Sequence, residues 1–411
     1  MLKSPYSNLS SVENNFISLY GEKGNQLVRY ENEFARFKKE FGYNCAYIAS
    51  SSGRVEVCGN HTDHNGGKVV SCAISLDTLA FFMPTDNNVI CIKSKGYSDI
   101  IVDINGKEIE KKGTSDALVR GIVVALKNKG YKVGGFNCTT TSSVLGGAGI
   151  SSSASFEVLI AEIINFLYND SKIDAETKAI VSQYAENVYF GKPCGLLDQT
   201  AIAFGGLKKL DFSNKDKIGV TNIDNSLSDY TLVLVNTGGS HANLTDEYAA
   251  IPAEMKAVAK AYGHERLIDM SKEEFIDGLA EKLNKLSDRS VLRAFHFYEE
   301  NERVDALEKA LDNNDYLAFE KCINDSGISS LNKLQNCYVG GSVDQAIPKA
   351  LAIAKNFDCA CNRVHGGGFA GTTLNIVKND KANDFILSMA KFYGQENVIP
   401  LKVRSVGTIV L

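Results

Sequence analysis

The spacing of apolar and polar residues predicts short strands and longer helices in the first half of the chain. Strands are expected where short apolar or alternating runs occur, at 46–49, 55–57, 69–74, 80–83, 89–92, 136–140, 207–212 and 230–235. Helices are expected where apolar residues recur at helical spacing over longer stretches, at 34–41, 116–129, 156–167 and 175–190.

The second half of the chain is predicted to be mainly helical as far as residue 334. Candidate helices lie near 245–262, 272–284, 287–312 and 315–325, and two β-like runs follow at 358–363 and 372–377. The segment 213–228 between the two halves is polar and turn-like. A domain boundary is therefore expected there, with one domain over residues 1–212 and a second over residues 213–411.

Length and composition describe an ordinary globular protein of about two domains. The chain has 411 residues, with 44% hydrophobic and 23% charged residues, and its net charge of −5 argues against nucleic acid as the main partner. No apolar run approaches the length of a membrane span. Ten scattered cysteines without a CxxC pair fit reduced thiols, so a cytoplasmic protein is expected. The expected assembly is a monomer or weak homo-oligomer.

A glycine- and serine-rich stretch at 145–157 stands between an extended run and the apolar helix pattern at 156–167. Glycines let the backbone approach a ligand closely, and the start of a helix offers unpaired N–H groups that suit phosphate. A flexible linker is the alternative, but a linker does not open directly into a core helix. The residues expected to bind phosphate are Gly147, Gly149, Ser151, Ser152, Ser153 and Ala154.

This stretch is not a Walker loop, because that motif needs Gly-Lys followed by serine or threonine. The Gly-Lys pairs at Gly67, Gly106 and Gly191 are followed by Val69, Glu108 and Pro193. Positive charge for the phosphate must therefore come from the backbone, a metal or distant basic residues.

A second glycine-rich segment, 365–371, formally contains GxGxxG. A dinucleotide-binding fingerprint should open a helix, whereas a β-branched run follows here. Two interpretations stay open: a tight turn inside a hairpin, and a second loop packed against a ligand.

Three separated motifs resemble those of one family. Gly53-Arg54-Val55 with 59–67 resembles the galactokinase signature G-R-V-N-L-I-G-E-H-T-D-Y-N-G-G. The glycine-serine stretch resembles P-L-G-x-G-L-S-S-S-A-S, and 363–371 resembles S-R-M-T-G-G-G-F-G-G. The segments 185–186 and 194–199 agree as well. The chain is identified by this resemblance as a GHMP kinase, with the galactokinases as the most similar branch.

The resemblance implies an α/β (α+β) two-domain GHMP kinase fold with mixed sheets, helices and a left-handed βαβ unit around the phosphate loop. It also implies that ATP, with Mg2+, phosphorylates a sugar at its anomeric hydroxyl, giving galactose 1-phosphate if the sugar is galactose. The expected partners are thus the sugar and ATP, without nucleic acid or a membrane.

By resemblance, Asp198 is the catalytic carboxylate, Arg54 lies beside it, and Ser153 and Glu186 hold Mg2+. Sugar contacts are implied for Asn60, His61, Asp63, Gly195 and Tyr248. The chemistry fits, since an attacking hydroxyl needs a proton acceptor and phosphoryl transfer needs nearby cations. Structural alternatives remain: Asp198 as a helix cap, Glu186 as a solvated charge, Arg54 as a surface residue, and Asn60 as a turn cap. A transition-metal site at His61, Asp63 and His64 is a further alternative.

Several residues depart from the family pattern. Asn60 replaces a glutamate, His64 a tyrosine, Leu145 a proline and Ala370 a glycine, and Ser240-His241 stands where basic residues are common. Several of these positions are expected near the sugar. A different sugar, such as a galactose derivative or L-arabinose, is therefore an alternative substrate. A non-catalytic galactose sensor is another, although the intact run from Ser151 to Ser155 disfavours it.

Overall fold

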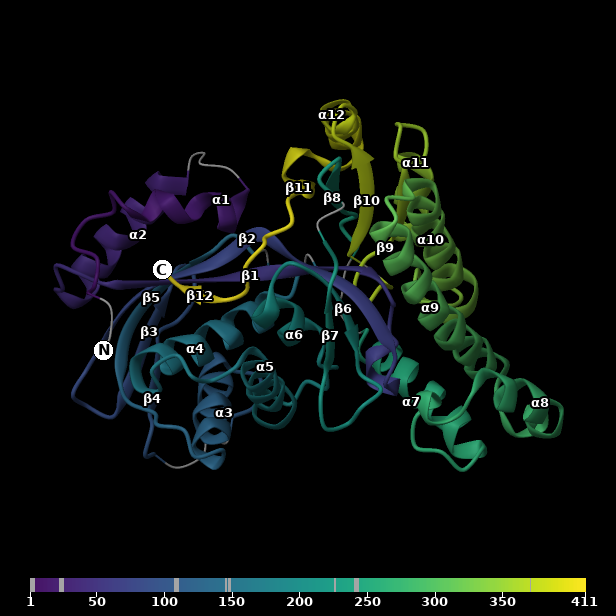
Figure 1. Ribbon diagram of the computed structural model, residues 1–411, viewed down its shortest axis with the longest axis horizontal. Coiled ribbons are helices and arrows are strands. Elements are labelled where there is room, and N and C mark those ends of the chain that lie inside the picture. The colour runs from purple at the N-terminus through teal and green to yellow at the C-terminus, as the bar shows by residue number, and fades with distance from the viewer. Residues whose placement is uncertain are drawn as a thin grey trace.

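The computed structural model describes residues 4–21, 26–106, 111–144, 146, 149–224, 227–239, 244–369 and 371–411 (Figure 1). Gly147, Leu145, Ala370 and Ser240-His241 lie outside the described residues. The described part forms two sheets with helices on both faces of each, in agreement with the mixed α/β fold expected from the motifs.

The first sheet has eight strands, six of them in the order β12-β1-β2-β5-β3-β4, with β6 on β2 and β7 on β6. The strands are β1 (Tyr47–Cys58), β2 (Lys68–Pro84), β3 (Val89–Ser94), β4 (Ile100–Asp103), β5 (Phe136–Ser142), β6 (Leu207–Asp211), β7 (Gly219–Asn222) and β12 (Ile409–Val410). Strands β3 and β5 run parallel, so the sheet is mixed. The 17-residue β2 joins the two apolar runs expected as separate strands and pairs with β5 at one end and β6 at the other.

Alternation along β1 and β2 explains why helices cover both faces of this sheet. Ile48 and Phe81 point toward α1 (Phe16–Tyr20) and α2 (Gln26–Phe41). Their neighbours Ala49 and Phe82 pack against the helices on the opposite face. Those helices are α3 (Ser115–Asn128), α4 (Ser152–Tyr168), α5 (Ala175–Tyr184) and α6 (Leu197–Phe204), which lie below the sheet in Figure 1.

The second sheet is antiparallel, in the order β11-β8-β10-β9. Its strands are β8 (Tyr230–Asn236), β9 (Cys361–Val364), β10 (Thr372–Lys378) and β11 (Val398–Leu401). The helices of this half are α7 (Thr245–Ala261), α8 (Lys272–Lys282), α9 (Asp288–Asp312), α10 (Tyr316–Ser329), α11 (Ala346–Ala354) and α12 (Ala382–Tyr393). One apolar core joins β1 and β2 to β8, β10, α9 and α10, so the two halves share buried surface.

Two strands of the first sheet lie beyond residue 212, where the domain boundary is expected. Strand β7 lies beyond it but pairs with β6 of the first sheet, so 213–228 is not turn-like throughout. Strand β12 returns from the end of the second half and pairs with β1. Arg404, fully buried, follows the same path and donates to Ser50 Oγ at 2.7 Å. Each half is thus built on its own sheet, but the first sheet contains strands from both sides of residue 212.

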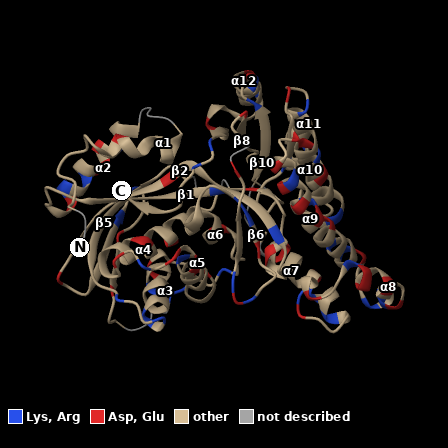
Figure 2. Ribbon diagram, viewed as in Figure 1, with Lys and Arg blue, Asp and Glu red and all other residues tan. Residues whose placement is uncertain are grey.

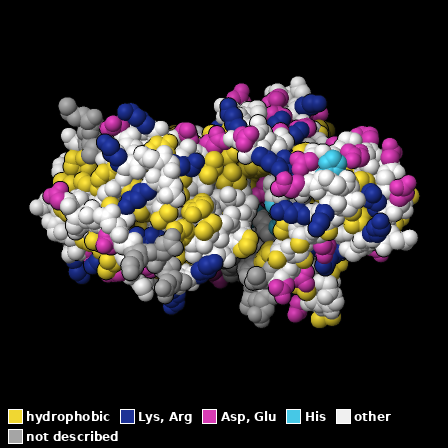
Figure 3. Space-filling view, turned by 90° about the horizontal axis from the view of Figure 1, so that it is seen from below, with side chains coloured by type: hydrophobic (Ala, Val, Ile, Leu, Met, Phe, Trp, Pro, Cys, Tyr) yellow, Lys and Arg dark blue, Asp and Glu magenta, His cyan; other side chains and the backbone are white. Residues whose placement is uncertain are grey.

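Charges of both signs are spread over the outer helices, as Figure 2 shows for α8, α9 and α10. The face seen in Figure 3 carries basic and acidic side chains side by side, with apolar side chains exposed between them. Among the described residues on that face, no continuous basic surface is visible. None of the helices in the described ranges is long and apolar enough to cross a membrane.

Candidate active site

A bulge in β1 brings the first motif against the phosphate loop. The pairing of β1 with β2 shifts between Ser52 and Arg54, and the Arg54 N–H donates to the Ile150 carbonyl at 3.3 Å. A Cβ at Gly53 would lie 2.8 Å from that same oxygen, so glycine is required there. Bulges bend a strand and redirect its side chains, and here Arg54 is directed toward the start of α4.

The phosphate loop ends in a left-handed residue, Ser151 (φ 63°), directly before α4. Gly149 also has a positive φ of 70°, and a Cβ there would lie 3.1 Å from Thr372 Oγ1. The segment 365–371 therefore packs against the phosphate loop while it connects the antiparallel strands β9 and β10. The hairpin interpretation of that segment is confirmed.

Arg54 and Asp198 form the central ion pair of the site. Arg54 Nε donates to Asp198 Oδ1 at 2.8 Å and Arg54 Nη2 lies 2.6 Å from the same oxygen. Ser151 Oγ donates to the other Asp198 oxygen, and Arg54 Nη1 donates to the Gly149 carbonyl. The Arg54 side chain is buried, whereas about a third (32%) of the Asp198 side chain is exposed. Asp198 thus holds a partly open carboxylate beside the phosphate loop and does not cap α6, whose N-cap is Leu196.

Glu186 brings the start of α4 together with the segment after α5. It lies in a π-helical turn (Ala185–Phe190), a geometry common at functional sites, and is 3% exposed. Ser153 Oγ donates to Glu186 Oε1 at 3.1 Å, and Lys192 Nζ lies 3.2 Å from the same oxygen. Gln199 Nε2 donates to the other oxygen at 3.0 Å. Glu186 is therefore not a solvated surface charge.

Ser153 and Glu186 fit a magnesium ion by the chemistry of their donors. A hydroxyl and a carboxylate oxygen are hard ligands, and Mg2+ needs only one or two protein oxygens when phosphate and water complete its shell. Glu157, also buried, is linked to this pair through Gln199, which donates to Glu157 Oε2 at 3.1 Å. Burial, and then the nearby Glu186 carboxylate, raise the pKa of Glu157 well above its ordinary value.

Asp63 and Gly195 meet on the other side of Asp198. A Cβ at Gly195 would lie 1.7 Å from Asp63 Oδ2. Residue 195 must therefore be glycine if Asp63 is to keep its position. Burial raises the pKa of Asp63 to about 6, and the charges of Asp198 and Glu56 add to the effect. The carboxyl groups of Asp63 and Asp198 thus belong to one electrostatically coupled site.

His61 and Tyr248 both contact the 365–371 segment. His61 Nε2 is 3.1 Å from the Gly367 carbonyl, and Tyr248 donates its hydroxyl to the Gly368 carbonyl at 3.0 Å. The Tyr248 ring meets Phe369 edge-on, with ring centroids 5.4 Å apart. Burial lowers the pKa of His61, which favours a neutral ring. The fold therefore brings His61, which is close to Asp63 in sequence, and the distant Tyr248 to the same loop.

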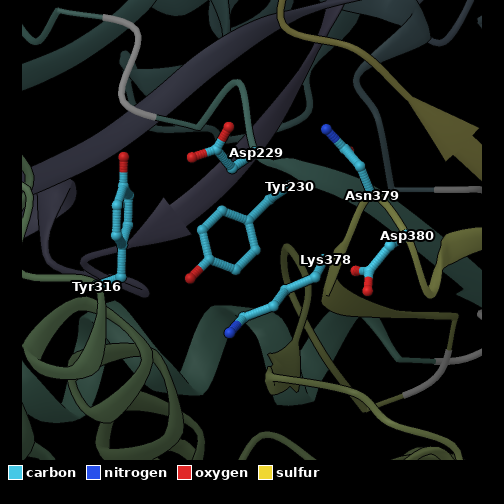
Figure 4. Close-up of a pocket in the computed structure, with 6 residues that line it drawn as sticks. All are labelled: Asp229, Tyr230, Tyr316, Lys378, Asn379 and Asp380. Carbon is cyan, nitrogen blue, oxygen red and sulfur yellow. The ribbon is translucent and has the colours of Figure 1, made fainter.

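A surface cavity of about 320 Å3 lies elsewhere, on the second half of the molecule (Figure 4). Its lining consists of Asp229, Tyr230, Tyr316, Lys378, Asn379 and Asp380. Figure 4 shows Tyr230 between Tyr316 and Lys378, with the two aspartates and Asn379 around it. None of the residues of the three motifs lines this cavity, so the cluster around Asp198 is the candidate active site.

Comparison with known proteins decides the family. The galactokinase galactose-binding signature matches residues 35–84, and the N-terminal domain of GHMP kinases matches residues 117–206. The galactokinase of Clostridium tetani is 30% identical over 385 residues, covering 90% of this chain and 95% of the relative. That of Glaesserella parasuis is 30% identical, covering 89% and 94%. The chain belongs to the galactokinase family.

Solved structures agree on the fold. Galactokinase from Lactococcus lactis, determined in complex with galactose, superposes with a TM-score of 0.82 at 24% identity, covering 93% of this chain and all of the other. Mevalonate kinase from Methanococcus jannaschii superposes with a TM-score of 0.62 at 15% identity, covering 87% and 98%. The two-sheet arrangement is thus the GHMP kinase fold.

Asn60, one of the expected sugar contacts, is hydrogen-bonded to other residues of the protein. Asn60 is fully buried, and its Nδ2 donates to Glu56 Oε1 at 2.8 Å and to the Gly366 carbonyl at 2.9 Å. Its Oδ1 accepts from Asn336 Nδ2 at 2.8 Å. Both amide groups are therefore occupied by the protein. Asn60 holds the first motif against the 365–371 segment and does not present a free acceptor to a sugar.

Glu56 and Lys192 also belong to the site, although neither was expected there. The galactokinase signature has asparagine at the position of Glu56 and glutamate at that of Asn60, so this chain exchanges the two letters. The exchange is visible in the sequence only when both positions are compared with the signature. Glu56 is buried, and its Oε1 lies 2.8 Å from Arg363 Nη2. Lys192 was considered only as a failed Walker lysine.

Proposed function

We propose that this protein transfers the γ-phosphoryl group of ATP to the anomeric hydroxyl of galactose, giving galactose 1-phosphate. The observation that carries the proposal is the Arg54–Asp198 pair, which opens a carboxylate toward the phosphate loop in a chain of the galactokinase family. ATP and galactose are the expected substrates, and Mg2+ the expected ion.

Asp198 accepts the proton of the anomeric hydroxyl as that oxygen attacks the γ-phosphorus. Two contacts fix the carboxylate for this role: Arg54 binds Oδ1 and Ser151 donates to Oδ2. Because Arg54 is buried, its charge acts on the Asp198 carboxylate through little solvent. The same guanidinium lies beside the phosphate loop, where it faces the charge that spreads over the transferred group.

The phosphate loop binds the ATP phosphates at the start of α4. Gly149, Ser151, Ser152, Ser153 and Ala154 provide its described backbone, and Gly147 is expected to take part as well. Ser153 and Glu186 would hold Mg2+. When bound, this ion neutralises charge on the phosphate oxygens.

The sugar is bound between Asp63 and the 365–371 segment. An ionised Asp63 accepts hydrogen bonds from sugar hydroxyls. His61 and Tyr248 form the neighbouring wall, and Gly195 leaves the space that a side chain would fill. The burial of Asn60 means that its departure from the signature does not remove a direct sugar contact, which supports galactose over the alternative sugars.

Two further assignments complete the proposal. The protein is assigned to the cytoplasm. Its ten free cysteines support this assignment, since none of them is fully exposed. The protein is a monomer or weak homo-oligomer. A non-catalytic sensor role is not favoured, because the Arg54–Asp198 pair and the serines at the start of α4 are all in place.

The test is a substrate panel with the purified protein, ATP and Mg2+. Galactose, galactosamine and L-arabinose are each offered, and the product is identified by phosphorus NMR as an anomeric phosphate. Galactose should give galactose 1-phosphate, and Asp198→Asn should remove the signal. A wild-type protein that phosphorylates only another sugar, or none, would contradict the proposal.

A further inference from the structure

A lysine from outside the phosphate loop reaches the start of α4. Lys192 follows Gly191 (φ 85°), which ends the π-helical turn after α5. Its Nζ lies 3.2 Å from Glu186 Oε1, and Ser153 Oγ donates to that same oxygen at 3.1 Å. The ammonium group therefore stands beside the first turn of α4, where the ATP phosphates are expected.

A polyanion that binds at this point needs a nearby cation, because acidic side chains lie around it. Glu186 and Asp198 bring two carboxylates to the place where a polyanion must bind. Arg54 is already engaged with Asp198 and with the Gly149 carbonyl. Lys192 differs because 63% of its side chain is exposed, so it can turn from Glu186 toward a ligand.

We propose that Lys192 binds a phosphate of the nucleotide. It thereby supplies, from the segment after α5, the ammonium group that a Walker loop carries in its own sequence. In the free protein, Lys192 pairs with Glu186. When the nucleotide binds, Nζ moves to a phosphate oxygen and leaves Ser153 and Glu186 Oε1, which would together hold a metal ion. This inference rests on the proposed function as an ATP-dependent kinase.

A purely structural salt bridge explains the contact less well. Because most of the Lys192 side chain is exposed, solvent screens its charge and the pair contributes little to stability. Glu186 also has other donors, since Ser153 and Gln199 already hydrogen-bond to it. The fold therefore does not need Lys192 to satisfy Glu186.

Binding of ATP in the presence of a chelator, measured by calorimetry, isolates the lysine from the metal. Lys192→Met should weaken ATP binding about tenfold, the size expected for losing a charge-assisted hydrogen bond to phosphate. Galactose affinity should stay unchanged. Lys172→Met is the matched control, because Lys172 is 77% exposed and pairs with Asp170 beyond the far end of α4. It should bind ATP like the wild type.

The same substitution made in a Glu186→Gln variant distinguishes two roles of Lys192. The lysine either contacts the phosphate directly or only neutralises Glu186. In Glu186→Gln, the carboxylate charge is gone, and adding Lys192→Met should still weaken metal-free ATP binding about tenfold. Disappearance of the loss in that background would overturn the inference, as would equal ATP affinity in Lys192→Met and wild type. A wild-type protein that binds galactose but no ATP would instead overturn the proposed kinase function itself.

Discussion

Glu56 and Asn60 are joined by a buried hydrogen bond of 2.8 Å, and they occupy two positions that are exchanged relative to the galactokinase signature. The exchange keeps one carboxylate and one amide in contact but moves the negative charge onto β1. There Arg363, fully buried, lies 2.8 Å from the carboxylate. Asn60 in turn donates to the Gly366 carbonyl, so the pair links β1 to the 365–371 segment.

Asn60→Glu should destabilise the protein, because it places a second carboxylate against Glu56 in a buried site. We expect a loss of about 3 kcal/mol in the free energy of unfolding, the cost of an uncompensated buried charge. The double variant Glu56→Asn/Asn60→Glu restores the signature and should recover most of that loss. Urea unfolding of the wild type, both single variants and the double variant measures the coupling. Purely additive effects would show that the two residues do not act as a pair.

Asp198→Ala should lower kcat by at least ~10²-fold while the protein stays folded, because the proton acceptor is lost. Asp198→Asn is the matched variant, since its amide oxygen can still accept from Arg54 or Ser151. Both should therefore lose turnover, with the asparagine variant closer to wild type in thermal stability. Steady-state kinetics and a thermal melt provide the measurement. Near-normal turnover in a folded variant would exclude Asp198 as the acceptor.

Ser153→Ala and Glu186→Gln should each raise the Mg2+ concentration that gives half-maximal rate, since each removes an oxygen ligand. The larger effect is expected for Glu186→Gln, which also removes a charge. The measurement is the initial rate at saturating ATP and galactose as Mg2+ is varied. Unchanged Mg2+ curves for both variants would place the ion elsewhere.

Galactose binding should weaken as the pH falls below about 6. The pKa of Asp63 is raised from 3.8 to about 6, mainly by burial, so its carboxylate is ionised above that pH and protonated below it. The ionised form accepts hydrogen bonds from the sugar, and protonation removes part of that capacity. The KM for galactose, followed from pH 5 to 8, should therefore rise toward the acid end. Asp63→Asn should have a higher KM that no longer changes through this range, and a wild-type KM that is flat with pH would argue against Asp63 as a ligand.

Long periodic elements were predictable, whereas short or polar ones were not. The apolar run of α4 and the turn between β9 and β10 follow from local sequence alone. Strand β7 was missed because it is a short edge strand whose exposed residues show no alternation. Helices α11 and α12 were also not anticipated, although both pack on the second sheet.

Within the site, motifs indicated which residues gather but not what each one touches. The contact of Arg54 with Asp198 joins residues 144 apart in the chain, and only the resemblance placed them together. The burial of Asn60 depends on Asn336, which is 276 residues away in sequence. Local patterns carry no information on such a partner, so Asn60 was interpreted as a sugar contact.

The return of β12 to β1 has a consequence for how the protein is made. Ser51 and Thr408 are hydrogen-bonded although they are 357 residues apart, and Arg404 lies 3.9 Å from the buried Asp77 carboxylate. Nearly the entire chain must leave the ribosome before these partners exist. Until then, β1 has an open edge, and Asp77 has only part of its final neutralisation. The half of the protein that is synthesised first is thus completed last.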